Sequence, residues 1–192
     1  MYLITRRLVF GLLAAVSFGS DRSPAAAAPN GPTISLATPV FPAERAYLLH
    51  ADTRQRFPNL GADFAVLAPA TGDKPDDRPG NYNCIAWSVG VTSHWVWPGD
   101  RVADFDRLYA GQGYRRQTIR DFRPVPGYQK IVLYGQLDET GRLKVTHAAR
   151  QLVDGTYTSK LGAGSLIRHH TPGALTGPAY GEPVAVYIRP AR

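Results

Sequence analysis

The spacing of apolar residues changes along this chain from the period of a helix to that of a β-strand, and this change constrains the fold most strongly. Apolar residues recur at helical intervals over 101–110, and 41–50 has the character of a second, shorter helix. Strand-like runs follow at 129–134, 143–152, 155–160 and 184–189. Turn signals such as Asp154-Gly155 separate these runs and favour antiparallel pairing. We therefore predict an α+β fold in which N-terminal helices pack on a C-terminal antiparallel β-sheet.

The first 27 residues have the features of a secretory signal. Arg6 and Arg7 precede an apolar run over 8–18, and small residues lead to an expected cleavage point after Ala27. The two arginines also give the segment a loose resemblance to a twin-arginine export signal. Because the run is shorter than the roughly 20 residues that cross a bilayer, we expect no membrane span after cleavage. An uncleaved amphipathic anchor is the alternative.

The chain thus divides into three expected parts. These are a signal peptide over 1–27, a leader and N-terminal segment over 28–56, and a folded domain over 57–192. We expect the mature protein to be exported, either to the periplasm or out of the cell, and to be a monomer.

The cysteine and charge content exclude several classes of protein. Cys84 is the single cysteine, which excludes a disulfide scaffold and a cysteine-rich zinc module. The histidines lack metal-ligand spacing and no glycine-rich phosphate loop is present, so we expect no metal and no cofactor. There are 22 Lys and Arg against 15 Asp and Glu, a net charge of +7. This positive charge favours anionic envelope partners. The basic residues are scattered except for Arg115, Arg116, Arg120 and Arg123, which we expect to form a solvated strand face instead of a nucleic-acid site.

Cys84 lies where a polar loop meets an apolar helical segment. Asn83 is a typical N-cap residue and Gly90 a typical helix end, which predicts a short helix opening at Cys84. Backbone N–H groups at a helix start favour the thiolate and can stabilise an oxyanion. An exported protein usually pairs its cysteines or lacks them, so a single free thiol suggests a nucleophile. The alternative is an inert cysteine of the core.

A thiol nucleophile needs an imidazole partner, and His147 is the first candidate. It lies in a predicted strand with small neighbours that leave room for the ring. A third residue would orient His147, and His169 is favoured because it shares a strand side with apolar Ile167. Further candidates for this third position are His170, Asn81, Asn83 and Asp154. The sequence therefore predicts a catalytic set of Cys84, His147 and His169.

The order Cys, His, polar residue on a helix start and two later strands resembles the papain-like cysteine peptidase superfamily. In order and size the chain is most similar to bacterial cell-wall endopeptidases and amidases. That resemblance implies a papain-like fold over 57–192, attack by Cys84 on an amide carbonyl, and His147 as base and then acid. The chain departs from these enzymes at Ile85 and Ala86, where they carry a small polar residue and a glycine. The implied substrate is a peptide or the stem peptide of the cell wall.

Four further residues are candidate substrate contacts: Tyr82, Asn83, Trp95 and Trp97. The first two flank Cys84, and the two indoles could stack on a sugar or peptide ring or else cover the core. The motifs around residues 82–87, 147–150, 158–162 and 180–181 are also similar to an uncharacterised bacterial domain family. Two other functions remain open: a non-catalytic module that binds envelope glycan or polyanion, and a secreted effector using the same thiol for transfer or deamidation.

Overall fold

The computed structural model describes residues 41–71 and 81–191, all of which lie in one compact unit, Ile34–Arg192. The expected signal peptide and the start of the leader lie outside the described residues. The helices are α1 (Pro42–Leu49), α2 (Ala51–Arg56), α3 (Cys84–Ser88), α4 (Val102–Gly111) and the 3₁₀ helix η1 (Pro172–Leu175). The strands are β1 (Phe64–Ala68), β2 (Arg115–Arg116), β3 (Tyr128–Leu137), β4 (Leu143–Gln151), β5 (Tyr157–Lys160), β6 (Leu166–His169) and β7 (Glu182–Pro190).

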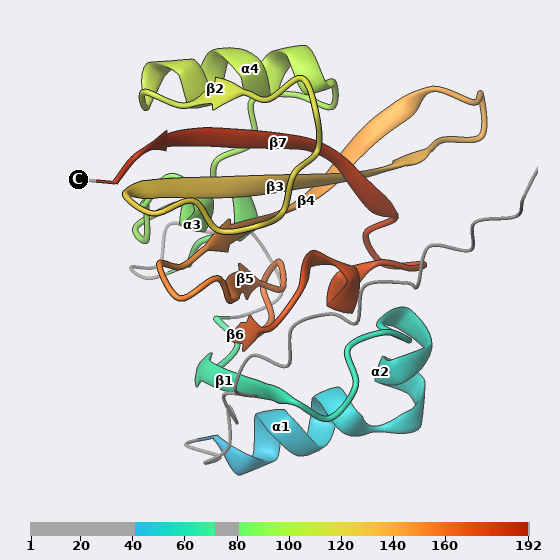
Figure 1. Ribbon diagram of the computed structural model, residues 1–192. Helices are drawn as coiled ribbons and strands as arrows, with labels where there is room; N and C mark the ends of the chain where they lie inside the picture. The colour runs from blue at the N-terminus through green and yellow to red at the C-terminus, as the bar shows by residue number, and fades with distance from the viewer. Residues whose placement is uncertain (1–40, 72–80, 192) are drawn as a thin grey trace, which may run out of the picture. The chain divides into compact units, whose positions relative to one another are not determined.

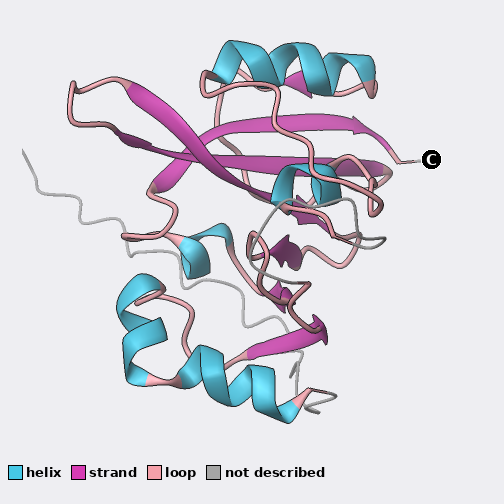
Figure 2. Ribbon diagram, turned by 180° about the vertical axis from the view of Figure 1, so that it is seen from behind, coloured by secondary structure: helices cyan, strands magenta, loops and turns pink. Residues whose placement is uncertain are grey.

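The strands form one antiparallel sheet of seven in the order β1-β6-β5-β4-β3-β7-β2. Helices α1 and α2 lie at the β1 end of the sheet, and α4 lies at the β7 end (Figure 1). Viewed from behind, α3 lies in front of the strands (Figure 2). The predicted α+β class and antiparallel pairing are confirmed. The predicted order of helices before the sheet is incomplete, because β1 precedes α3 and α4 along the chain.

Two apolar clusters cover the two faces of the sheet, and β3 contributes to both. Ile131 and Leu133 pack with α3 and α4, whereas Val132 and Tyr134 pack with α1, β6 and η1. Successive side chains of a strand point to opposite faces, so burial of both faces makes the central strand apolar throughout. All four of these β3 side chains are completely buried.

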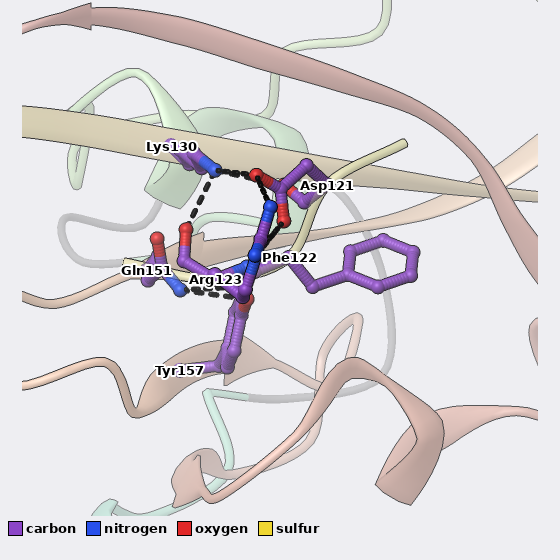
Figure 3. A network of polar contacts seen from close by, with 6 residues as sticks. All are labelled: Asp121, Phe122, Arg123, Lys130, Gln151 and Tyr157. Atoms are coloured by element: carbon purple, nitrogen blue, oxygen red, sulfur yellow. Dashed lines mark hydrogen bonds and ion pairs between the residues drawn. The ribbon is translucent and has the colours of Figure 1, made fainter. Parts of the chain in front are cut away.

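A buried lysine fastens the loop before β3 to the sheet. The network joins Asp121, Phe122, Arg123, Lys130, Gln151 and Tyr157 (Figure 3). The Lys130 ammonium donates to the carbonyl oxygens of residues 121 and 123, at 2.8 and 2.6 Å. Gln151 and Tyr157 both donate to the carbonyl oxygen of residue 122. Three consecutive loop carbonyls are thereby satisfied in the interior.

One junction of the sheet is short. Strands β4 and β5 pair at two positions, Arg150 with Thr158 and Gln151 with Tyr157. The preceding part of β4 is not paired with β5, and α3 packs against both strands there. The sheet therefore leaves a place beside β4 that the start of α3 occupies.

Candidate active site

Asn83 fixes the start of α3, as its sequence predicts. Its side-chain oxygen accepts a hydrogen bond of 2.9 Å from the Ala86 N–H, and its side-chain nitrogen donates to the Val96 carbonyl at 2.9 Å. Val89 ends the helix and Gly90 follows with φ +82°, a conformation that favours glycine. Cys84 is therefore the first residue of a helix whose start is held by a buried cap.

The Cys84 thiol lies against β4 with 3% of the residue exposed. The backbone amides of Ala148, Ile85 and Cys84 itself interact with the sulfur and lower the pKa of the thiol. Burial opposes them and has the larger effect, so the pKa of Cys84 is raised to about 11. The thiol is therefore neutral near pH 7 in the resting protein.

His147 lies on β4 immediately before Ala148 and has no exposed surface. Neither ring nitrogen has a hydrogen-bond partner among the described residues, so the imidazole and the Cys84 thiol are not hydrogen-bonded. Burial, with a smaller effect from His169, holds the pKa of His147 well below its usual value. A buried polar group without a partner costs about 1–3 kcal/mol. The His147 ring is thus neutral, and burying its nitrogens without partners destabilises the fold.

The register of β4 explains why the thiol and the imidazole do not meet. His147 is opposite Tyr134, so these two side chains project from the same face of the sheet. Cys84 instead packs with Ala148, in the apolar cluster of the other face. The sulfur therefore contacts the backbone of β4 beside His147, while the imidazole shares the opposite face of β4 with Tyr134.

Tyr180 lies near both the His147 imidazole and the Cys84 thiol, and it also lines a surface groove. Its ring is stacked on His147, with centroids 3.9 Å apart and planes inclined by 10°. The charge of the Cys84 thiolate also contributes to raising the pKa of Tyr180, after the larger effect of burial. Tyr180 lines a groove of about 620 Å³, together with Trp95, residues of α1 and α2, and the 161–165 turn. The tyrosine thus lies between the buried imidazole and a surface groove.

The predicted third residue, His169, is buried on β6 with its neighbour His170 nearer the surface, as the alternation predicts. The Nδ1 atom of His169 lies 2.8 Å from the Thr171 carbonyl, and Nε2 lies 3.0 Å from the Ser159 hydroxyl. The carbonyl can only accept, so Nδ1 donates and Nε2 accepts from Ser159. Both nitrogens are thus occupied, and the effect of His169 on His147 is electrostatic.

The other candidates for the third position lie elsewhere. His170 Nε2 is 2.7 Å from a carboxylate oxygen of Asp63. Asp154 forms an ion pair with Arg168. The side-chain oxygen of Asn81 accepts a hydrogen bond from the Trp95 indole at 2.9 Å.

The predicted substrate contacts separate into different places. Trp95 lines the groove, while Trp97 packs edge-on against Phe105 of α4 at 5.9 Å. Tyr82 is buried over α3, with its ring 6.1 Å from that of Trp87. Since Asn83 uses its side chain as the helix cap, the structure brings only Trp95 of these four to the groove.

Sequence reasoning missed Lys160 and Tyr180 as members of the site. Lys160 is completely buried and donates to the Thr71 hydroxyl and the Gly162 carbonyl, at 3.0 and 2.9 Å. Burial lowers its pKa to about 8, against the attraction of Cys84. Both residues lie in the motifs, residues 158–162 and 180–181, that resemble the uncharacterised domain family. That resemblance is the sequence signal that could have indicated them.

A family model described as a domain of unknown function, DUF7689, matches residues 73–188. The chain belongs to this family. The match to DUF7689 spans Cys84, His147, Lys160 and Tyr180. Comparisons with curated proteins and with solved structures found no match. Within the described part of the chain, no helix combines the length and apolar character needed to cross a membrane, and no three His, Cys, Asp or Glu side chains cluster as metal ligands would.

Proposed function

We propose that this protein is a thiol-dependent hydrolase of amide bonds, with Cys84 as nucleophile and His147 as general base. The observation that carries the proposal is the buried, unpartnered imidazole of His147 on the strand that the Cys84 sulfur contacts. A buried polar group that no structural partner explains is expected where chemistry needs it. The papain-like resemblance of the sequence supports the same assignment.

In the proposed reaction His147 removes the Cys84 proton as the sulfur forms a bond to the amide carbonyl carbon. The amides of Cys84 and Ile85 stabilise the resulting oxyanion. Collapse of the tetrahedral intermediate expels the amine, which takes the proton from His147, and leaves a thioester. Water, activated by His147, then releases the acid and restores the thiol. The two groups are not hydrogen-bonded at rest, so the first step requires a local rearrangement of α3 or β4 that brings the imidazole to the sulfur.

Lys160 supports the thiolate in this proposal. With a pKa of about 8 its ammonium is mostly protonated at pH 7, and its charge favours the ionised form of Cys84. The ammonium is also held 5.3 Å from the centroid of the Tyr82 ring. A positive charge fixed in the interior offsets part of the desolvation that opposes thiolate formation.

The groove beside Tyr180 is the proposed binding site for the substrate, which we infer to be a peptide or a cell-wall stem peptide. Its volume of about 620 Å³ is in the range of sites for small ligands. Tyr47, Trp95 and Tyr180 supply aromatic faces, while Glu44 and Arg56 supply charges of both signs. We propose that the substrate meets the enzyme outside the cytoplasm, on the basis of the signal-like N-terminus.

A second function, a non-catalytic envelope-binding module, is favoured by the raised pKa of Cys84, which makes the resting thiol a poor nucleophile. The two functions differ in what the thiol does. In a binding module Cys84→Ser leaves binding to purified cell wall unchanged, and the wild type releases no new amines from it.

The decisive experiment measures alkylation of Cys84 by iodoacetamide in the wild type, in His147→Gln and in His170→Gln. If His147 is the base, His147→Gln slows alkylation about tenfold or more, and the surface control His170→Gln does not. Circular dichroism verifies folding. Equal rates in all three proteins would overturn the Cys84–His147 assignment. Release of amines from purified cell wall and from a peptide mixture, lost in Cys84→Ser, then tests the substrate class.

A further inference from the structure

A second pocket, away from the thiol, gathers arginine side chains on one face of the sheet. It has a volume of about 440 Å³ and lies where β3 begins and β4 and β7 end. Its charged lining residues are Arg150, Arg168, Arg189 and Asp154. Three guanidinium groups against one carboxylate give this pocket a net positive charge.

The strand register explains why the three arginines lie on one face of the sheet. Arg150 is opposite Thr158, and Thr158 is opposite Arg168, so these side chains project from the same face. Arg150 is also opposite Ile131, and Gln129, two residues earlier on β3, is opposite Arg189. Residues two apart on a strand share a face, so Arg189 joins the other two arginines.

The three arginines differ in how their charge is compensated. Arg168 forms an ion pair with Asp154, which neutralises the one carboxylate of the pocket. Arg189 donates to the neutral oxygens of Gln129 and Gln112, and its guanidinium lies 4.3 Å from the Tyr114 ring centroid. Two of the three guanidinium charges therefore have no carboxylate partner among the residues that the structure describes.

Arg150 is the least satisfied of the three. Its Nε atom is buried and has no hydrogen-bond partner within the described residues. Its guanidinium lies 5.9 Å from the centroid of the Trp87 ring. No hydrogen bond or ion pair joins the Arg150 side chain to another described residue, so the guanidinium N–H groups that line the pocket are available to a ligand oxygen.

We propose that this pocket binds an oxyanion, carried by a ligand as a carboxylate or a phosphate group, between Arg150 and Arg189. Arginine recognises both groups through paired N–H donors, and the pocket is large enough for either. The site does not depend on the proposed thiol chemistry, because none of its residues takes part in that reaction.

The test uses the full chain and follows Trp fluorescence and the melting temperature as inorganic phosphate or acetate is added, with sodium chloride at matched ionic strength as reference. We expect phosphate, acetate or both to raise the melting temperature beyond the chloride reference and to change the emission of Trp87. Phosphate alone identifies a phosphate-bearing ligand, and acetate a carboxylate-bearing one. In Trp87→Phe the fluorescence change disappears and the shift in melting temperature remains.

Matched variants locate the site. Arg150→Gln weakens binding about tenfold or more, and Arg150→Lys, which keeps the charge but loses the fork, weakens it less. Arg142→Gln removes the same charge from an exposed turn and leaves binding unchanged. Because Arg150 has no hydrogen bond at Nε, these variants are expected to fold, and Arg189→Gln gives a second test. No stabilisation beyond chloride, or wild-type binding by Arg150→Gln, overturns the proposal.

Discussion

The ring of Tyr180 covers the ring of His147, with centroids 3.9 Å apart and planes only 10° from parallel. This contact keeps the imidazole out of the groove that Tyr180 itself lines. His147 is therefore kept neutral both by its buried position on β4 and by the ring of Tyr180 that shields it from the groove.

Replacing Tyr180 by alanine should open His147 to the groove. Water then stabilises the imidazolium, so the pKa of His147 rises toward the ordinary value of 6.5. Titration of the histidine ring protons by NMR measures the change. Tyr180→Phe keeps the stacked ring and should leave the pKa low, and an equal rise in both variants would show that stacking is not the cause.

Acid should destabilise the fold through its two buried histidines. Burial lowers the pKa values of His147 and His169, the latter to about 4, below their unfolded value of 6.5. The unfolded chain therefore binds more protons, and stability that is present above pH 6.5 is lost as the pH falls. For His169 alone the loss amounts to about 3 kcal/mol by pH 4. Urea unfolding between pH 7 and pH 4 measures it.

A matched variant separates the contribution of His147. His147→Phe retains an aromatic ring and removes an imidazole that has no hydrogen-bond partner among the described residues. We expect it to unfold with about 1–3 kcal/mol more stability at pH 5 and with a flatter pH profile than the wild type. A pH profile as steep as that of the wild type would mean that protonation of His147 is not part of the acid response.

Alkylation of Cys84 should depend steeply on pH. Burial raises the pKa of the thiol to about 11, above the value of 9.0 for a free thiol, so the thiolate fraction at pH 8 is small. In His147→Gln, which lacks the proposed base, the rate with iodoacetamide is expected to rise about tenfold per pH unit from pH 7 to 10. Mass spectrometry follows the reaction. The urea-unfolded chain is the control, and it should reach its plateau about two units lower.

The same shift has a consequence for stability in alkali. Because the pKa of Cys84 is raised on folding, its contribution is complete below pH 9 and is lost as the pH rises toward 11. Cys84→Ala removes this dependence. Over pH 9–11 the unfolding free energy of the wild type should therefore fall more steeply than that of Cys84→Ala. Equal slopes would contradict the raised pKa.

Removing the helix cap should disturb the site without touching the thiol. Asn83→Ala leaves the Ala86 N–H and the Val96 carbonyl without their partner, which is expected to cost about 1–2 kcal/mol. Chemical denaturation measures the loss, and alkylation of Cys84 at pH 8 should become faster as the helix start loosens. Asn83→Asp keeps the cap oxygen, so its stability and its alkylation rate should lie between those of Asn83→Ala and the wild type.

The buried Lys130 should be necessary for the loop before β3. Lys130→Met keeps the apolar stem but leaves the carbonyls of Asp121 and Arg123 unsatisfied, at a cost of about 1–3 kcal/mol (Figure 3). Lys144→Met is the matched control, because its ion pair with Asp100 is half exposed and contributes little. Equal losses in the two variants would show that the loop is held by other contacts.

Sequence patterns predicted the central elements of this fold well because their signals are local. The cap at Asn83, the start of α3 at Cys84 and the strands β4 and β7 follow from side chains near each boundary. Strand β1 is short and pairs with β6, where Phe64 lies opposite His169 although the two are 105 positions apart in the chain, a relationship that no local pattern reveals. The indoles of Trp95 and Trp97 lie in a loop, so they do not share a strand face.

The candidate site was only partly predictable for the same reason. The burial of His169 follows from alternation and the strand position of His147 from its neighbours, but the partners of each ring depend on which strands become neighbours. The contact of Cys84 with Ala148 instead of the imidazole depends on the register of β4 with β3. Tyr180 reaches His147 from a turn 33 residues later, which the spacing of apolar residues could not indicate.

Among the described residues, two residue pairs are all that directly joins β4 to β5, and these two strands are where the β1-β6-β5 half of the sheet meets the β4-β3-β7-β2 half. Helix α3 packs across this joint, with Cys84 at its first turn and His147 on the adjoining strand. The sulfur and the imidazole therefore both lie where the two halves of the sheet join. A substitution that shifts α3 at this joint would change the distance between sulfur and imidazole, and so the reactivity of the pair, without replacing either residue.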